Sequence, residues 1–340
     1  MIRSETVKKH SSAIILALVM APLLALTADQ PAALNLIILI GIYGLMATSL
    51  GMIYGQAGMM SLCQAGFAAL GAYGTAIVSA RWGLDPLWGL LAAVLLPALI
   101  AYPFARLIVT LSPLALALAT LFLGTIITIA LNQGGDFTGG YLGIGGIPVL
   151  SFAVTPLKFA ILVWVFAILA VVLYANLLGT AAGRALNTLR VDAIRSRADG
   201  DRGPHRLSVL FAFAAGLAGC SGWLYAHYML YVSPDGLSMH VSLTLLLMVL
   251  LGGARHVLGP ILGAFLLTYL NDLLPGEIRG LLYGCAVVVV LIIAPRGVLG
   301  TLDTVWRRRV GKQTRADLPG DRADGLATSP ASPLKKGDSL

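Results

Sequence analysis

Long apolar stretches alternate with short polar segments along most of the chain. The apolar blocks fall at 12–27, 34–54, 60–80, 87–105, 113–131, 157–178, 208–229, 241–253, 259–274 and 280–295. Most of them approach the roughly 20 residues that a helix needs to cross a hydrocarbon core of ~30 Å. The pattern therefore predicts an all-α, polytopic transmembrane helix bundle with about ten spans.

The two ends of the chain differ from this apolar middle. A basic start and the apolar run Ala13–Leu26 are not followed by a good cleavage site for a signal peptide, so residues 1–33 are interpreted as a cytoplasmic N-terminus and first span. Residues 34–302 form the predicted transmembrane domain, which includes a basic loop at 179–207. Residues 303–340 are polar and contain prolines, which predicts a disordered cytoplasmic tail.

Two segments interrupt the helical pattern with glycine. Block 241–253 is too short to span alone, and the run Gly252–Pro260 that overlaps its end holds glycines, a proline and a charge. The run Gly55–Gly66 has a similar character. Glycine-interrupted helices at corresponding places in two halves indicate a translocation site at a repeat interface, although glycine packing between ordinary helices produces the same composition.

These two interrupted segments supply the predicted pathway residues. The candidate polar contacts are Gln56, Ser61 and Gln64, and the candidates for backbone access are Gly55, Gly58, Gly252 and Gly259. Irregular backbone is tolerated at membrane depth only where it is buried in protein or lines a wet cavity. We therefore expect the permeant molecule to pass between the two segments.

Composition and charge support a membrane class and exclude nucleic acid as a partner. Apolar residues make up 58% of the chain and charged residues 11%, against roughly a quarter charged in soluble domains. The net charge of +8 comes from Lys and Arg residues that lie between spans, where the positive-inside rule places them. With about ten spans, the distribution predicts that both termini are cytoplasmic.

The basic loop contains a segment with helical potential, Gly183–Gly200. Leu186, Leu189 and Ile194 could share part of one face of a short interfacial helix there. The alternative is that the arginines of this loop serve only as a topology anchor.

Candidate chemistry is sparse. The three cysteines, Cys63, Cys220 and Cys285, lie in apolar blocks without metal-site spacing, so no metal site and no catalytic residue is predicted. An intramembrane serine protease is the enzyme alternative, because Ser221 lies in a Gly-x-Ser-Gly pattern, but His227 follows six residues later on a different helix face. Tyrosines around His227 favour an interface position for it.

The chain resembles the permeases of branched-chain amino acid importers, whose close relatives import urea. The resemblance covers about 34–302. It is carried by Gly58–Leu62, Phe67, Gly71–Tyr73, Leu116–Leu121, Thr138–Gly140, Gly145–Pro148, Gly183–Ala185, Ala218–Gly219, Leu224–His227, Tyr231–Pro234, Leu246–Met248, Gly252–Gly253, Gly259–Pro260, Leu262–Ala264 and Ala294–Gly297. The sequence departs from the family pattern where Ala193–Ser196 replaces a Glu-x-Ala-Ala stretch, and at Cys63–Gln64 and Arg255–His256.

The resemblance implies a subunit of an ATP-binding-cassette importer in a bacterial inner membrane, not an enzyme. Its implied partners are ATPase subunits, a second permease of the same fold, a periplasmic substrate-binding protein and the lipid bilayer. No phosphate-binding Gly-x-x-x-x-Gly-Lys-Ser/Thr motif occurs, so no cofactor is expected here and ATP would bind to the partners. The basic loop would then couple to the ATPase through Gly183, Arg184, Leu189, Arg190, Ile194 and Gly200.

Two other functions stay open at this stage. One is a urea or amide importer permease of the same class. The other is an ion-coupled secondary transporter, since such carriers also use broken helices. Carriers of that kind commonly place carboxylates inside their spans, and here only Asp272, near a span end, comes close.

Overall fold

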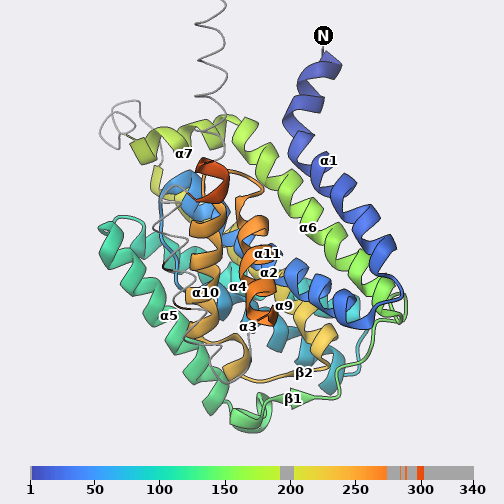
Figure 1. Cartoon of the computed structure of the whole chain (residues 1–340). Coiled ribbons are helices and arrows are strands. Elements are labelled where there is room, and N and C mark those ends of the chain that lie inside the picture. Colours follow the sequence, from blue (N-terminus) through green and yellow to red (C-terminus); the bar gives the residue numbers. More distant parts are fainter. Residues whose placement is uncertain (1, 192–202, 274–283, 285–287, 289–296, 302–340) are drawn as a thin grey trace, which may run out of the picture. The chain divides into compact units, whose positions relative to one another are not determined.

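The computed structural model describes residues 2–191, 203–273, 284, 288 and 297–301. Within them the chain is helical except for loops and one pair of two-residue strands (Figure 1). The elements are α1 (Ile2–Thr27), α2 (Pro31–Ala57), α3 (Gln64–Ala76), the π-helical turn η1 (Ile77–Arg81), α4 (Pro86–Ile108), α5 (Pro113–Gln133), η2 (Gly135–Phe137), η3 (Gly140–Leu142), β1 (Ile144–Gly145), α6 (Pro156–Gly179), α7 (Ala181–Val191), α9 (Gly203–Met229), β2 (Tyr231–Val232), η4 (Asp235–Leu237), α10 (Met239–Gly252) and α11 (Gly259–Leu273).

The all-α prediction is confirmed, and each predicted block up to 259–274 coincides with a helix. Six helical segments among the described residues are long and apolar enough to cross a membrane, namely α2, α4, α5, α6, α9, and α10 with the turn before it. Block 280–295 and the tail 303–340 lie outside the described residues, apart from two isolated positions.

Several helices begin where a capping residue precedes proline. Asp85 accepts a hydrogen bond from the N–H of Leu87 (2.8 Å) at the start of α4. Ser112 and Thr155 cap α5 and α6 in the same way. The side chain satisfies a free N–H of the first turn, and the proline that follows has no N–H to satisfy. These dipeptides fix the helix starts locally.

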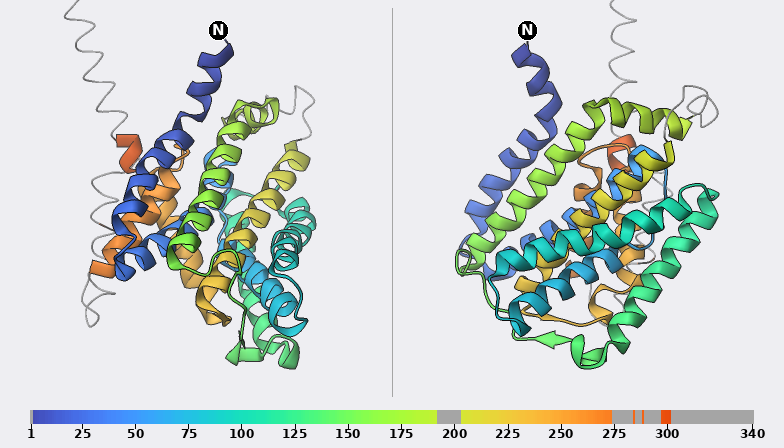
Figure 2. Two further views of the ribbon diagram at one scale, coloured as in Figure 1. Left: turned by 90° about the vertical axis from the view of Figure 1, so that its right-hand side faces the viewer. Right: turned by 180° about the vertical axis from the view of Figure 1, so that it is seen from behind.

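Helices α2 and α9 are mostly buried within the bundle, whereas α4 and α5 expose many apolar side chains. Figure 2 shows the arrangement of the helices from two further sides. Of the apolar stretches, 83% of the one in α2 and 72% of the one in α9 are buried, against 22% in α4. Large apolar side chains of α5, including Leu118, Phe122 and Ile129, point outward. In a membrane the lipid tails solvate such a surface.

Glycines bring the backbones of α3, α4 and α9 into direct contact. A Cβ added to Gly71 of α3 would lie 2.5 Å from Gly219 Cα in α9. A Cβ on Gly219 would meet the carbonyl oxygen of Ala93 in α4, and one on Gly222 would meet that of Ala68 in α3. Close approach of this kind is how small residues stabilise helix pairs where lipid removes the hydrophobic driving force.

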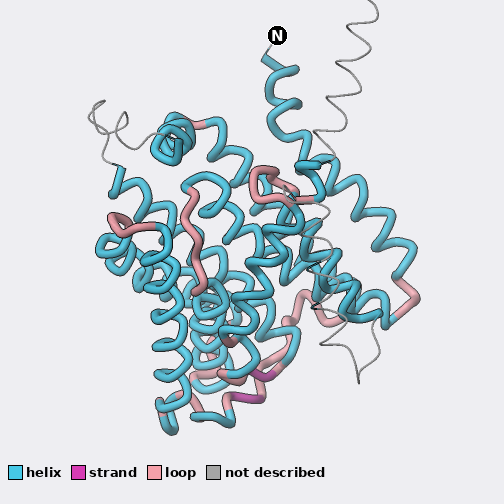
Figure 3. The backbone as a smooth tube through the Cα atoms, turned by 60° about the vertical axis from the view of Figure 1, so that its left-hand side comes forward, coloured by secondary structure: helices cyan, strands magenta, loops and turns pink. Residues whose placement is uncertain are grey.

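At the end of the bundle away from α7, β1 pairs antiparallel with β2, with Ile144 opposite Val232 (Figure 3). His227 is buried beneath this loop at 3% exposure, and its Nδ1–H donates to the carbonyl oxygen of Pro148 (2.9 Å). The membrane depth expected for His227 stays a prediction. The loop that follows β1 and contains Pro148 covers the ring. The sequence of α9 alone does not indicate this burial.

Candidate translocation and coupling site

The first glycine-interrupted segment breaks the helix as the sequence predicts. α2 ends at Ala57, and Gly58 adopts a left-handed conformation with φ 68°. Its N–H donates to the carbonyl of Tyr54 (3.1 Å). A left-handed residue after the last helical turn is a common helix stop, and glycine takes it without strain. Residues 58–63 then form a non-helical linker before α3 begins at Gln64.

Polar side chains from three other helices meet the linker and the start of α3. The N–H of Leu62 donates to Thr120 Oγ1 of α5 (3.0 Å), and the N–H of Ala65 donates to Ser242 Oγ of α10 (3.1 Å). Gln64 Nε2 donates to Ser49 Oγ of α2 (2.9 Å). Because lipid offers no hydrogen bonds, such partners are what allow irregular backbone at this depth.

One acceptor in this cluster has no partner. Gln64 is fully buried, and its Oε1 makes no hydrogen bond within the described structure. An unmet buried carbonyl oxygen costs about 1–3 kcal/mol. Such an atom is suited to accept a hydrogen bond from a ligand that reaches it.

The second interrupted segment is a pair of half-helices joined by a tight connection. α10 ends at Gly252, Gly253 has φ 106°, and α11 begins at Gly259. A Cβ on Gly252 would meet the carbonyl oxygen of Gly259, and one on Gly263 would meet that of Met248. These glycines therefore let the two half-helices pack backbone against backbone in this conformation.

The two breaks touch each other. A Cβ on Gly55, in the last turn of α2, would meet the carbonyl oxygen of Ala254 in the second break and the hydroxyl of Tyr174 in α6. Pro260 packs on Gly51 one turn earlier. The end of α2 thus has no room to shift without displacing the connection between α10 and α11.

The predicted pathway residues surround this junction but differ in exposure. Ser61 and Gln64 are fully buried, and Gln56 is 6% exposed. Gly58 lines a cavity of about 520 Å³ near α7, together with Tyr54, Met59 and Arg190.

The predicted coupling helix is α7, which begins close after α6 ends (Figure 1). Thr180 Oγ1 accepts from the N–H of Gly183 (3.1 Å), and Arg184 donates back to the carbonyl of Gly179 (3.1 Å). Leu186 is 2% exposed and packs with Met52, Tyr174 and Leu210. The helix is therefore tied to α2, α6 and α9 by an apolar contact.

Other coupling candidates face the bundle as well. A Cβ on Gly203, the first residue of α9, would lie 2.8 Å from Leu189 Cδ2. Arg190 donates from Nη1 to the carbonyl oxygen of Gly55, and its Cγ would lie 3.3 Å from a Cβ on Gly58. Ile194 and Gly200 lie outside the described residues. Arg190 thus joins α7 directly to the first break.

Sequence reasoning missed Ser49, Thr120 and Ser242 as partners of the break. Hydroxyl residues in apolar helices commonly bond to their own backbone, as Thr125 does to the carbonyl of Leu121 (3.1 Å). Thr120 also bonds to its own helix, at the carbonyl of Ala117 (2.9 Å), so no local signal marks its second role. Thr120 lies within the stretch that carried the family resemblance, which is the one hint available.

Replacing Thr120 with Val is expected to lower the free energy of unfolding by about 1–3 kcal/mol, because the half-buried N–H of Leu62 loses its acceptor. Thermal unfolding of the purified chain in detergent measures the change. Thr125→Val is the matched control on the same helix, and its melting temperature should stay close to that of the wild type. Equal shifts in both variants would show that the linker does not depend on Thr120.

Comparison with known proteins places these features in a family. A family model described as "Branched-chain amino acid transport system / permease component" matches residues 32–294. The high-affinity branched-chain amino acid transport system permease protein LivM of Escherichia coli is 31% identical over 293 residues, covering 76% of this chain and 68% of the relative. LivM of Salmonella typhimurium matches with the same identity and coverage. No solved structure matches the chain.

The match covers both helix breaks and the basic loop that contains α7. The relatives are transport permeases, consistent with a multi-pass membrane protein of an importer rather than an enzyme. The chain belongs to the branched-chain amino acid transport system permease component family.

Proposed function

We propose that this chain is the inner-membrane permease subunit that carries branched-chain amino acids in an importer whose ATP is bound and hydrolysed by separate subunits. The family and the two LivM relatives support this class of substrate. A second permease of the same fold and a periplasmic binding protein would complete the assembly.

The observation that carries the proposal is the hydrogen bond from Arg190 of α7 to Gly55 at the first break. An importer whose ATPase subunits lie outside the membrane needs a contact that transmits their movement to the translocation pathway. α7 provides one end of such a contact, because Arg184, Asn187 and Thr188 are exposed on it. Arg190 provides the other end, since Gly55 also touches Ala254 of the second break. Movement of α7 would therefore reach both breaks.

The pathway would open between the two breaks. The side chains of Gln56, Ser61 and Gln64 would contact the permeant molecule. The backbone of Gly55, Gly58, Gly252 and Gly259 would line its path. The unmet Gln64 Oε1 supports this role, because an amino acid arrives with an ammonium group that donates hydrogen bonds. Ser61 and Gln64 are buried, so the conformation described would be a closed one.

The proposed topology has about ten spans with both termini cytoplasmic. The end of the bundle that carries α7 would then face the cytoplasm, and the β1–β2 end would face the periplasm. The arginines of α7 and Arg106 at the end of α4 lie on the proposed cytoplasmic side, in agreement with the positive-inside rule.

Transport by the reconstituted assembly tests the function. Proteoliposomes holding this chain with its partner permease and ATPase subunits should accumulate leucine or isoleucine when ATP and the binding protein are supplied. Urea should not be accumulated. Uptake that follows a proton or sodium gradient without ATP would identify a secondary transporter instead, and uptake of urea alone would identify an amide importer.

A further inference from the structure

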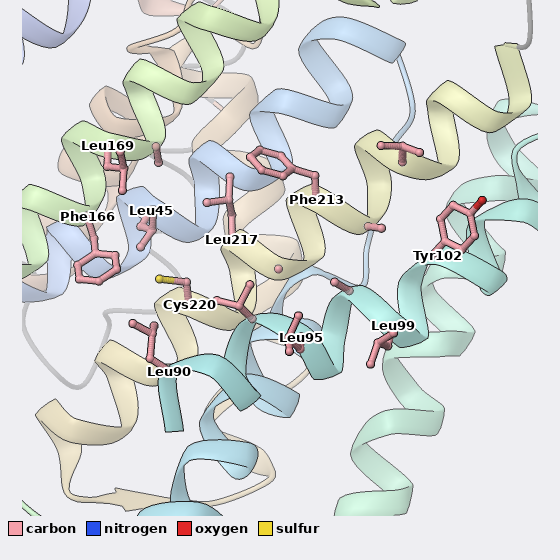
Figure 4. A pocket seen from close by; sticks show the side chains of 16 residues that line it. Leu45, Leu90, Leu95, Leu99, Tyr102, Phe166, Leu169, Phe213, Leu217 and Cys220 are labelled. Atoms are coloured by element: carbon pink, nitrogen blue, oxygen red, sulfur yellow. The ribbon is translucent and has the colours of Figure 1, made fainter. Parts of the chain in front are cut away.

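An apolar groove of about 600 Å³ opens on the side of the bundle between α4, α6 and α9. Leu90, Leu95, Leu99 and Tyr102 follow one another along its α4 wall (Figure 4). Leu99 is 69% exposed. From Leu90 to Tyr102 the helix advances ~18 Å at ~1.5 Å per residue. That length is comparable with one leaflet of the hydrocarbon core, which is roughly 15 Å deep.

A polar cluster closes the groove at the end nearest α7. The hydroxyl of Tyr102, a groove residue, lies 3.3 Å from Nδ1 of His205, and Arg106 Nη1 lies 3.5 Å from the same nitrogen. A guanidinium can only donate hydrogen bonds, so Arg106 brings N–H donors to this end of the groove. Both Arg106 and His205 are exposed. The cluster therefore presents N–H donors at one end of an apolar groove.

We propose that this groove is a binding site for an anionic phospholipid, with an acyl chain against α4 and α9 and the phosphate held by Arg106 and His205. Charge complementarity favours this occupant, because a guanidinium matches the geometry of a phosphate and Arg206 adds a further positive charge beside His205. Basic pockets between transmembrane helices bind anionic headgroups in this way. Asp85, the acidic residue beside α4, caps the opposite end of that helix.

The site does not depend on which molecule is transported. Only the assignment to the cytoplasmic leaflet follows from the proposed topology. The lipid would fill a groove that lies away from the two helix breaks, so it would stabilise the packing of α4 and α9 rather than enter the pathway.

Native mass spectrometry of the purified full chain tests the site. The chain is mixed with phosphatidylglycerol or with phosphatidylcholine, and retained lipid is counted. We expect phosphatidylglycerol to be retained in preference, and the preference to fall about fivefold in Arg106→Gln, the loss expected for one basic residue near a headgroup. Ala98→Phe, which fills the groove, should reduce retention of both lipids. Arg81→Gln, at an exposed arginine on the opposite end of the bundle, is the control and should change nothing.

Three outcomes would overturn the proposal. If the wild type retains the two lipids equally and Arg106→Gln does not change this, another subunit or unselected lipid covers the groove. A thermal stabilisation by inorganic phosphate equal to that by phosphatidylglycerol would mean a free-anion site. Retention in Arg106→Gln equal to that in the wild type would mean that the lipid binds elsewhere, and this test stands even if Ala98→Phe fails to fold.

Discussion

Replacing Arg190 with Gln is expected to abolish ATP-driven uptake while leaving basal ATP hydrolysis in place. The substitution removes the charged group that donates to the carbonyl of Gly55 and shortens the side chain that lies near Gly58. A hydrogen bond to a charged group contributes about 1.5–3 kcal/mol. If that bond forms in only one of two conformations of the transport cycle, its loss shifts the equilibrium between them by roughly 10- to 150-fold.

The measurement is uptake per ATP hydrolysed in proteoliposomes that contain the whole assembly. Stimulation of the ATPase by the loaded binding protein should disappear together with uptake. Arg81→Gln is the control, because this exposed arginine lies in η1 at the opposite end of the bundle from α7. Arg190→Lys should be intermediate, since an ammonium keeps the charge without the planar fork. Wild-type uptake by Arg190→Gln would remove α7 from the coupling mechanism.

Replacing Gly71 with Ala is expected to cost about 3 kcal/mol or more of folding free energy. The new Cβ would lie 2.5 Å from Gly219 Cα and 2.7 Å from its carbonyl carbon. Both are backbone atoms, so no rotamer change relieves the overlap and the two helices have to separate. Insertion of extra carbon into a well-packed interior typically costs about 1–3 kcal/mol, and this site is tighter than most.

Gly74→Ala is the control on the same helix. Its Cβ would meet Ala92 at 3.7 Å, an ordinary van der Waals contact, and alanine favours a helix over glycine by up to ~1 kcal/mol. Thermal unfolding in detergent should therefore show a large drop for Gly71→Ala and no drop, or a small rise, for Gly74→Ala. Similar melting temperatures for the two variants would contradict the close approach of α3 and α9.

The sequence predicted the helices because their signals are local. Apolar length identifies each span, and the pairs Asp85-Pro86, Ser112-Pro113 and Thr155-Pro156 mark where helices start within one or two residues. The two breaks were also predictable, because glycine at Gly58 and Gly253 permits backbone conformations that other residues rarely adopt.

The partners of the breaks were not predictable, because they come from distant parts of the chain. Leu62 bonds to a residue 58 positions away, and Ala65 to one 177 positions away. Arg190 meets Gly55 across 135 positions. These pairs depend on how whole helices pack, and hydroxyl or basic side chains carry no sign of which distant backbone group they will meet. The pathway and coupling residues proposed from the sequence remain predictions for the same reason.

The glycine contacts among α3, α4 and α9 constrain how the molecule can change shape. Where backbone meets backbone, as at Gly71, Gly219 and Gly222, no side chain can adjust to take up a small sliding of one helix past another. These three helices should therefore travel as a single rigid body during any transport cycle. The angular change then falls on hinges outside these contacts, for which the linker 58–63 is a natural position, since it has no helical ladder to break.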